Sequence, residues 1–258
     1  MSFEGKTAWI TGASSGIGAA LAEELLKAGH QLALSARSSG PLQDFAARYG
    51  EQVLVAPGDL TDAERVRAIG ERIAQHWGVL DCVILNAGTC EYVDVRHFEA
   101  AMIERVVSAN LFSASYCIEA ALPLLRQGER PHLVGVGSSV TFMPLPRAEA
   151  YGASKAAMRY LMQTLRIDLA SEGIDVTLVS PGFVDTPLTQ KNDFPMPMRW
   201  PVERAARYIA ERLDKRPHEI AFPTPFIAVL KLLGSLPSSL QLAIGRRLAR
   251  NEDNEDNA

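Results

Sequence analysis

The sequence predicts a single α/β domain built on a doubly wound parallel sheet, followed by a C-terminal helical extension. Short, strongly apolar segments alternate with longer amphipathic segments along residues 7–179. Strands that lack polar alternation are buried on both faces, and helices on both sides of a parallel sheet achieve this. The length of 258 residues and the 47% share of apolar residues are sufficient for one large core.

Six short apolar runs predict the strands. Glycine, proline or polar residues bound the runs, as is typical of buried strands that alternate with helices. The expected strands are residues 7–10, 32–35, 53–55, 83–85, 133–136 and 176–179.

Helices are expected between these strands, and two of them carry clear end signals. The first follows a glycine-rich turn and runs to Lys27, and Gly29 ends it because glycine adopts positive φ without strain. Residues 61–64 (Thr-Asp-Ala-Glu) form a capping box, which predicts a helix that runs to about Trp77. Further helices are expected around residues 98–125 and from near Tyr151.

The chain divides into one large domain and a C-terminal part. Residues 1–222 form the expected α/β domain, and a proline-rich apolar loop at about residues 187–206 interrupts its pattern, as an active-site lid does. Residues 223–250 have apolar positions at helical spacing. The polar residues 251–258 are expected to be disordered.

Composition and charge argue against several kinds of partner and site. The 26 basic and 30 acidic side chains give a formal charge of −4, whereas proteins that bind nucleic acids usually carry excess positive charge. The three cysteines do not form a disulfide framework and the five histidines form no metal motif, so no metal is expected. The N-terminus lacks a signal-peptide pattern, and the apolar run 226–233 is too short to span a membrane. We therefore expect a cytoplasmic protein.

A glycine-rich turn, residues 11–18 (Thr-Gly-Ala-Ser-Ser-Gly-Ile-Gly), lies between the first strand and the first helix. Such a turn presents main-chain N–H groups at a helix N-terminus, where their partial positive charge favours a diphosphate. A Cβ atom would block the approach of the ligand, which explains the glycines. The alternative is a tight turn without a ligand, but the position between strand and helix favours a dinucleotide.

The end of the second strand indicates which dinucleotide is bound. An acidic residue here would bind the ribose hydroxyls of NAD and repel a 2′-phosphate. The sequence is instead Ser35-Ala36-Arg37-Ser38. Arg37 and Ser38 can hydrogen bond to a 2′-phosphate, although a solvated surface arginine is the alternative. We therefore expect NADP(H).

Tyr151 and Lys155 are four residues apart and so lie on one face of a helix. Alone, this pair also fits an ordinary surface helix. Residues 86–88, Ser138 and residues 181–182 each follow a strand at its C-terminal end, where ligands bind in open α/β sheets. This combination makes Tyr151 and Lys155 catalytic candidates.

The motifs are Thr11 to Gly18, Asp59, Asn86-Ala87-Gly88, Asn110, Ser138, Tyr151 with Lys155, and Pro181-Gly182 with Thr186. A chain with these motifs in this order resembles the short-chain dehydrogenase/reductase family in its single-domain form, over roughly residues 5–222. The resemblance implies a Rossmann-type fold, a nicotinamide cofactor and a homodimer or homotetramer formed through the helices that carry Asn110 and Tyr151.

The resemblance also implies a catalytic role for four residues. Tyr151 is the expected acid/base, and Ser138 is its partner on the substrate oxygen. Lys155 is expected to bind the nicotinamide ribose, and Asn110 to hold a water that relays protons to Lys155. A neighbouring ammonium favours a phenolate, so we expect Lys155 to lower the pKa of Tyr151 from its usual value of about 10.

Cofactor contacts are expected at the strand ends. By resemblance, Asp59 meets the adenine, Asn86 lines the cofactor trough and Thr186 meets the nicotinamide amide. The expected cofactor-binding residues are Gly12, Ser14, Ser15, Gly16, Ile17, Gly18, Arg37, Ser38, Asp59, Leu60, Asn86, Ala87, Gly88, Tyr151, Lys155, Pro181, Gly182, Val184 and Thr186.

Apolar residues in the loops near the nicotinamide indicate a hydrophobic carbonyl substrate rather than a phosphorylated sugar, although each residue alone also fits packing of the lid. The expected substrate contacts are Ser138, Met143, Leu145, Tyr151, Phe183, Leu188, Phe194, Met196 and Trp200.

Three functions remain open. The first is an NADP(H)-dependent oxidoreductase that interconverts a hydrophobic ketone or aldehyde and its alcohol. The second is a non-catalytic NADP(H)-binding sensor. The third is a membrane-peripheral lipid-modifying reductase that uses the arginine-bearing extension 223–250, although packing on the core or a subunit contact is the favoured interpretation of that segment.

Overall fold

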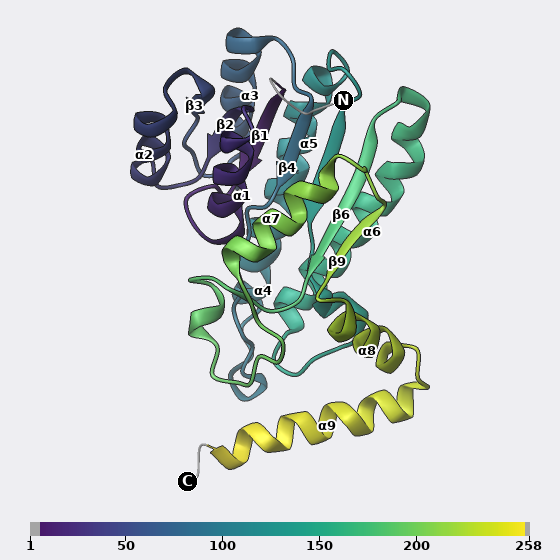
Figure 1. Ribbon diagram of the computed structural model, residues 1–258. Coiled ribbons are helices and arrows are strands. Elements are labelled where there is room, and N and C mark those ends of the chain that lie inside the picture. Colours follow the sequence, from purple (N-terminus) through teal and green to yellow (C-terminus); the bar gives the residue numbers. More distant parts are fainter. Residues whose placement is uncertain (1–5, 256–258) are drawn as a thin grey trace.

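A seven-stranded parallel sheet forms the centre of the protein, in the strand order β3-β2-β1-β4-β5-β6-β9 (Figure 1). This computed structural model describes residues 6–255, apart from the side chains of Lys191 and residues 250–255. The strands are β1 (Thr7–Thr11), β2 (Gln31–Ser35), β3 (Val53–Val55), β4 (Cys82–Leu85), β5 (His132–Val136), β6 (Asp175–Pro181) and β9 (Glu219–Phe222). The chain winds outward from β1 first toward β3 and then toward β9, which confirms the doubly wound Rossmann-type sheet.

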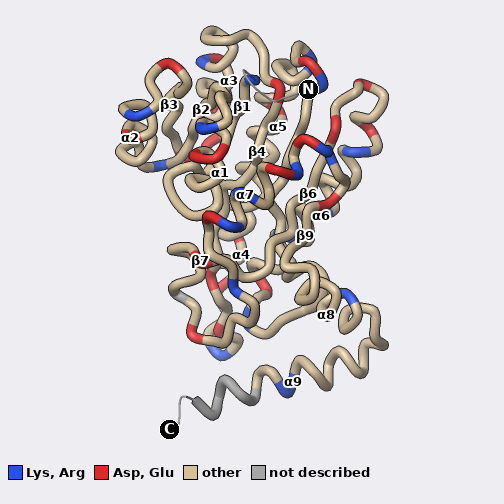
Figure 2. The backbone as a smooth tube through the Cα atoms, viewed as in Figure 1, with Lys and Arg blue, Asp and Glu red and all other residues tan. Residues whose placement is uncertain are grey.

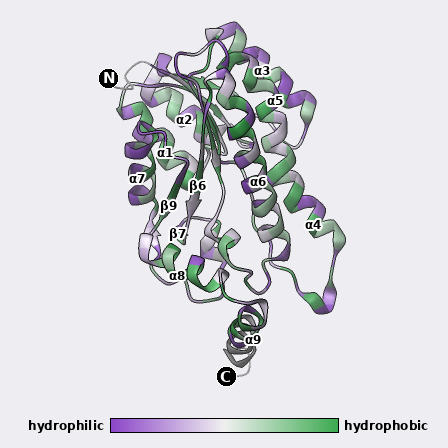
Figure 3. Ribbon diagram, turned by 90° about the vertical axis from the view of Figure 1, so that its right-hand side faces the viewer, coloured by the Kyte–Doolittle hydropathy of each residue, from purple (hydrophilic) through white to green (hydrophobic). Residues whose placement is uncertain are grey.

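Helices cover both faces of the sheet (Figure 3). One face packs against α1 (Gly16–Lys27), α2 (Gly40–Tyr49) and α7 (Val202–Leu213), and the other against α3 (Ala63–Trp77), α5 (Ser113–Leu125) and α6 (Glu149–Asp168). The strand β1 shows how the sequence builds two cores: Ala8 and Ile10 belong to the first, and Trp9 between them belongs to the second. Successive side chains of a strand point to opposite faces, so an apolar run fills both cores.

The helix predicted from residues 61–64 forms, but its cap differs from the expected one. Asp62 is the N-cap residue, and its carboxylate accepts hydrogen bonds from the main-chain N–H groups of Glu64 and Arg65 at 2.9 and 3.1 Å. Thr61 donates its hydroxyl to the Asp59 carboxylate instead, at 2.8 Å. A carboxylate that satisfies two free donors of the first turn is the stronger cap.

Several elements differ from the sequence prediction. Neither α2 nor the edge strand β9 was expected, because both are short and lie next to polar, turn-forming residues. The helix expected around residues 98–125 is divided into α4 (Ala100–Val107), a π-helical turn η3 (Ser108–Phe112) and α5. Such turns interrupt α-helices mostly at functional positions.

The segment 187–206, which the sequence analysis expects to be a lid, contains a short strand and the start of a helix. At the base of this segment, β7 (Val184–Asp185) pairs with β8 (Trp200–Pro201), and α7 already begins at Val202. The last residues of the expected lid at 187–206 therefore belong to a helix, whose Ala205 and Ala206 are fully buried in the core.

The C-terminal extension consists of two helices. The first, α8 (Thr224–Gly234), buries Ile227 and Leu230, whereas α9 (Ser238–Glu255) lies below the domain in Figure 1 and exposes leucines. Since α9 ends at Glu255, the expected boundary at residue 250 is not the end of the helix. The disorder expected for residues 251–258 stays a prediction, because residues 256–258 and the side chains of residues 251–255 lie outside the described part.

Charged residues of both signs are mixed along the described chain (Figure 2), and they do not gather in one basic stripe. In residues 6–255, we find no helix with the length and apolarity that crossing a membrane requires. Among the side chains that the structure describes, no group of three or more His, Cys, Asp or Glu residues is placed to hold a metal ion.

Candidate active site

A cavity of about 540 Å³ opens at the C-terminal ends of the central strands. Its lining comes from the segments that follow β1, β2, β4, β5 and β6, together with α6 and the loop after β7. Parallel strands present their carboxyl ends at one edge, and ligands of doubly wound sheets bind there. All the cofactor-binding residues expected from the sequence line this cavity except Gly18 and Ser38.

The glycine turn leaves room that other residues would fill. Gly12 and Gly16 have φ angles of +68° and +55°, which side chains rarely adopt. A Cβ atom on Gly12 would lie 2.8 Å from the Cα of Ala87, and one on Gly18 would collide with the carbonyl oxygen of Gly12. Gly18 therefore acts in the packing of the turn rather than on the cavity surface.

The N-terminus of α1 points its free donors at this turn. The N-cap residue Ser15 makes no side-chain capping hydrogen bond, and the first turn contains no acidic residue. The first N–H groups of the helix are thus available to an anion. Ser14, Ser15 and Thr186 lie around the same part of the cavity. These residues fit the diphosphate of a dinucleotide.

Asn86 braces the turn from the neighbouring strand. Its amide nitrogen donates to the carbonyl oxygens of Thr11 and Gly12 at 3.1 and 3.2 Å. The hydroxyl of Thr11 in turn accepts from the main-chain N–H groups of Asn86 and Ala87 at 3.0 and 3.1 Å. The two strand ends are therefore fixed to each other by four hydrogen bonds.

Arg37 lies exposed at the end of β2 and lines the cavity, whereas the exposed Ser38 does not. Asp59 lies on the same side. Hydrogen bonds from the N–H group and hydroxyl of Thr61, and the charge of Arg37, lower the pKa of Asp59 despite the opposing effect of burial. The adenosine end of the cavity thus offers a guanidinium and a carboxylate that stays ionised.

Tyr151 and Lys155 both line the cavity, one turn apart on α6, as the sequence predicts. The Lys155 Nζ lies 5.9 Å from the centre of the Tyr151 ring and donates a 2.8 Å hydrogen bond to the carbonyl oxygen of Val136. The hydroxyl of Ser138, which follows β5, lies close enough to Tyr151 to lower the pKa of the phenol. It also accepts from the main-chain N–H of Val140 at 3.2 Å.

The expected lowering of the Tyr151 pKa is wrong for the protein alone. Burial raises the pKa of Tyr151 to about 12, and the nearby Ser138 hydroxyl only partly opposes this effect. Burial also lowers the pKa of Lys155 to about 8. Both groups lose solvation of their charged form, and this loss is the largest effect on each pKa. Tyr151 consequently keeps its proton at neutral pH.

Asn110 is buried in the π-helical turn η3 and does not line the cavity. Its amide nitrogen donates to the Thr89 carbonyl and the Ser154 hydroxyl, both at 2.9 Å, and its oxygen accepts from the Thr89 N–H at 2.7 Å. Only Gly88 separates it from Lys155, because a Cβ atom there would lie 2.9 Å from Asn110 Oδ1 and 3.4 Å from Lys155 Nζ. That Asn110 holds a relay water stays a prediction.

The segment after β4 contributes residues that the sequence analysis missed. Thr89 and Glu91 line the cavity, and Arg105 of α4 joins them through a 2.9 Å ion pair with Glu91. Cys90 lies close enough to Lys155 for the ammonium to lower its thiol pKa, although burial raises that pKa overall. The signal that could have found this segment is its position immediately after a strand end.

The expected substrate residues divide into two groups. Phe183 and Phe194 lie together, with ring centres 6.1 Å apart, and Tyr92 and Phe226 each pack 5.5 Å from one of them. We call these four residues the aromatic wall. None of the four lines the cavity, but Tyr92 lies near enough to Tyr151 to interact with it electrostatically. Of the expected substrate residues, Ser138, Tyr151 and Leu188 line the cavity.

The other expected substrate residues lie elsewhere. Met143 is buried, and the sulfur of Met196 accepts a hydrogen bond from Asn192 at 3.3 Å. The Trp200 ring stacks on Phe222 at 5.0 Å, within the core beneath α7. Met143, Leu145, Met196 and Trp200 are not part of the cavity lining, which is consistent with packing.

Comparisons with known proteins identify the family of the chain. A sequence model of the short chain dehydrogenase family matches residues 6–195. An uncharacterized oxidoreductase of Myxococcus xanthus (strain DK1622) is 34% identical over 250 residues, which cover 94% of this chain and 97% of the relative.

Two solved structures resemble the chain along most of its length. The Pseudomonas aeruginosa RhlG/NADP active-site complex has a TM-score of 0.80 at 28% identity and covers 88% of this chain and 98% of its own. A short chain dehydrogenase/reductase from Burkholderia phymatum in complex with NAD has a TM-score of 0.82, covers 90% and 94%, and at 24% identity supports the fold alone. The family match and the site at the strand ends together show that the chain belongs to the short-chain dehydrogenase family, whose members are oxidoreductases that use a nicotinamide cofactor.

Proposed function

We propose that the protein is an NADP(H)-dependent reductase that interconverts a lipophilic ketone or aldehyde and the corresponding alcohol. The observation that carries this proposal is the convergence of Ser138, Tyr151 and Lys155 on one cavity, with Ser138 near enough to Tyr151 to lower its pKa. A set of this kind serves proton transfer to a carbonyl oxygen. Binding of a dinucleotide alone does not require it.

NADPH, when bound, supplies the hydride. Negative charge then develops on the carbonyl oxygen, and the hydroxyl groups of Ser138 and Tyr151 donate hydrogen bonds to it. Tyr151 transfers its proton to this oxygen. Because burial raises the pKa of Tyr151 to about 12, the phenol is protonated at neutral pH and ready to act as the acid. The protonated Lys155 stabilises the phenolate that remains.

The preference for NADP(H) is supported by the end of β2. Residues 35–38 contain no carboxylate to repel a 2′-phosphate, and Arg37 lines the cavity there. The guanidinium is free to form charge-assisted hydrogen bonds to a phosphate. We therefore propose NADP(H) rather than NAD(H) as the cofactor.

A lipophilic substrate is supported by the aromatic wall. Four rings from the segments after β4, β6 and β9 and from the loop 187–200 form an apolar cluster, and Tyr92 of this cluster lies near Tyr151. Apolar side chains with a few aimed polar groups are typical of sites for hydrophobic ligands. Ring-containing ketones are therefore the first substrates to test.

The test is the oxidation of NADPH, followed by its absorbance, with a panel of aromatic and alicyclic ketones and aldehydes. The proposal expects turnover of at least one lipophilic carbonyl compound and little of phosphorylated sugars. The rival function is a non-catalytic NADP(H) sensor. Tight NADPH binding without turnover across the whole panel would favour that rival and contradict the proposal.

A further inference from the structure

We propose that Glu219, together with Arg159 and Lys231, positions the active site by tying the catalytic helix α6 to the turn that carries Ser138. The inference rests on the proposed function, because it concerns the placing of Tyr151 and Ser138 for proton transfer. It assigns a role to β9 and α8, which lie outside residues 6–195 matched by the family model.

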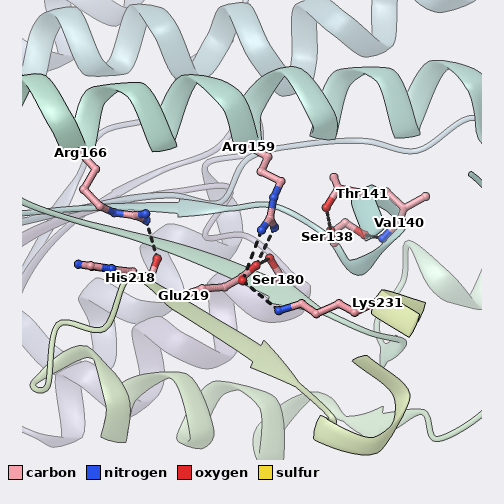
Figure 4. A network of polar contacts seen from close by, with 9 residues as sticks. All are labelled: Ser138, Val140, Thr141, Arg159, Arg166, Ser180, His218, Glu219 and Lys231. Atoms are coloured by element: carbon pink, nitrogen blue, oxygen red, sulfur yellow. Dashed lines mark hydrogen bonds and ion pairs between the residues drawn. The ribbon is translucent and has the colours of Figure 1, made fainter. Parts of the chain in front are cut away.

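Glu219, the first residue of β9, joins three elements through its carboxylate (Figure 4). Arg159 of α6 donates to its two oxygens at 2.7 and 3.4 Å. The hydroxyl of Ser180 in β6 donates at 2.7 Å, and the ammonium of Lys231 in α8 lies 3.5 Å away. One carboxylate thus holds a helix on the sheet and a second helix at its edge.

The ring of Phe142 connects this network to the catalytic serine. The Arg159 Cζ lies 4.9 Å from its centre and the Lys231 Nζ lies 4.7 Å from it, so the ring contacts both cations. Phe142 ends the short 3-10 turn η4 (Ser139–Phe142), for which Ser138 is the N-cap residue. The network therefore holds the far end of the turn that begins at Ser138.

The packing of α8 supports the same connection. A Cβ atom on Gly234, at the C-terminal end of α8, would collide with the carbonyl oxygen of Phe142. The helix and the turn are therefore in direct main-chain contact. A shift of α8 cannot leave the turn unaffected.

Arg159 is well placed to transmit the effect to the catalytic pair. Tyr151, Lys155 and Arg159 follow one another at intervals of four residues, so they share one face of α6. Lys155 bonds to β5 and Arg159 bonds to β9, which fixes this face at two successive turns. Loss of the Arg159–Glu219 contact would leave α6 attached at Lys155 alone and more mobile next to Tyr151.

The Glu219 carboxylate is the central member of the network because it neutralises the two cations, Arg159 and Lys231. The side chains of Glu219 and Arg159 are each only 22% exposed, so water screens their interaction weakly. Burial alone would raise the pKa of Glu219, but hydrogen bonds from Arg159 and Ser180 and the charges of Arg159 and Lys231 lower it. Without this negative charge, two cations near the Phe142 ring would lack a neutralising partner.

The test compares Glu219→Gln with the matched variant Glu172→Gln. Glu172 also receives two hydrogen bonds from an arginine, Arg126, at 2.6 and 3.2 Å, but this pair lies at the other end of α6, beyond Asp168. We expect Glu219→Gln to lower kcat for ketone reduction about tenfold while the Kd of NADPH and the KM stay within a factor of about two. Glu172→Gln is expected to change none of them.

The exposed Lys231 provides a second, milder pair of variants. Lys231→Met is expected to lower kcat. Lys231→Arg is expected to keep the wild-type kcat, because arginine retains a positive charge next to the Glu219 carboxylate and the Phe142 ring. Equal kcat values for wild type, Glu219→Gln and Lys231→Met would overturn the inference. A parallel loss of NADPH binding and kcat in Glu219→Gln would also overturn it, since that outcome indicates general damage to the fold.

Hydrogen exchange separates this inference from the proposed function. Amide exchange in residues 138–143 is expected to rise in Glu219→Gln and not in Glu172→Gln, whatever the substrate is. If the wild type reduces no carbonyl compound but exchange rises as expected, the proposed function fails and the structural coupling stands. Unchanged exchange in residues 138–143 would contradict the coupling itself.

Discussion

Lys155 donates its hydrogen bond to the carbonyl oxygen of Val136, 2.8 Å away, and not to its neighbour Tyr151. This contact fixes the ammonium beside the end of β5, where Ser138 follows two residues later. We therefore expect the lysine to act on the Tyr151 phenolate through its charge rather than through a direct bond. The first prediction follows from this arrangement.

The rate of carbonyl reduction should fall as the pH rises through about 8. Burial lowers the pKa of Lys155 to about 8, so its charge is present below this pH and lost above it. The Tyr151 pKa of about 12 keeps the proton donor intact over the same range. The profile of kcat/KM between pH 6 and 10 reports this titration.

Lys155→Arg provides the control, because a guanidinium keeps its charge over this range. Its profile should lose the fall near pH 8, even if its rate is lower throughout. A wild-type rate that increases through pH 8 would contradict the assignment.

Arg37→Ala should weaken NADPH binding about tenfold to hundredfold and leave NADH binding nearly unchanged. The expected loss corresponds to one or two charge-assisted hydrogen bonds to the 2′-phosphate. Titration calorimetry with both cofactors measures it. Arg72→Ala, on an exposed part of α3 away from the cavity, serves as the charge-matched control. Equal losses for NADPH and NADH would count against the phosphate contact.

Gly12→Ala should abolish measurable dinucleotide binding or destabilise the protein by roughly 2–4 kcal/mol. Gly12 has a φ of +68°, and its new Cβ would meet Ala87 at 2.8 Å. The control is Gly40→Ala, since nothing lies within 4 Å of a Cβ atom there. Thermal unfolding with and without NADPH measures both effects. Normal binding by Gly12→Ala would contradict the close approach of the turn to a ligand.

The oligomer expected through the helices that carry Asn110 and Tyr151, here α4-η3-α5 and α6, should dissociate when their exposed apolar residues become charged. Tyr160 and Ile167 of α6 are 74% and 75% exposed, and Phe112 beside the start of α5 is 48% exposed. Ile167→Asp places an unpaired charge in that surface. Light scattering after size exclusion should report a dimer or tetramer for the wild type and a smaller species for the variant. An Ile167→Asp mass equal to that of the wild-type oligomer would contradict this interface.

Much of the fold could be predicted because short stretches of sequence determine most of its strands and turns. Apolar runs predicted six of the seven strands of the sheet. Because ligands bind at the carboxyl ends of parallel strands, Ser138, Tyr151 and Lys155 could be predicted to share one cavity. The strand β9 was missed because its four residues carry no distinctive pattern. The cap at Asp62 was misassigned because Thr61 and Asp62 are both good cap residues, and only the three-dimensional turn decides between them.

What could not be predicted depends on distant contacts and on burial. Arg159 and Glu219 are 60 residues apart in sequence, and no local pattern pairs them. The pKa of Tyr151 was expected to fall because the charge of Lys155 is visible in the sequence, whereas the desolvation that raises it is not. Trp200 fits a substrate lid by composition, but its ring stacks on Phe222 in the core.

Replacement of Tyr151 by phenylalanine tests the central claim most directly, with Tyr160→Phe on the exposed face of the same helix as the control. The account predicts that Tyr151→Phe retains NADPH binding and loses at least about a hundredfold in kcat for ketone reduction, while Tyr160→Phe keeps the wild-type rate. Full activity of Tyr151→Phe would contradict the assignment of this phenol as the proton donor.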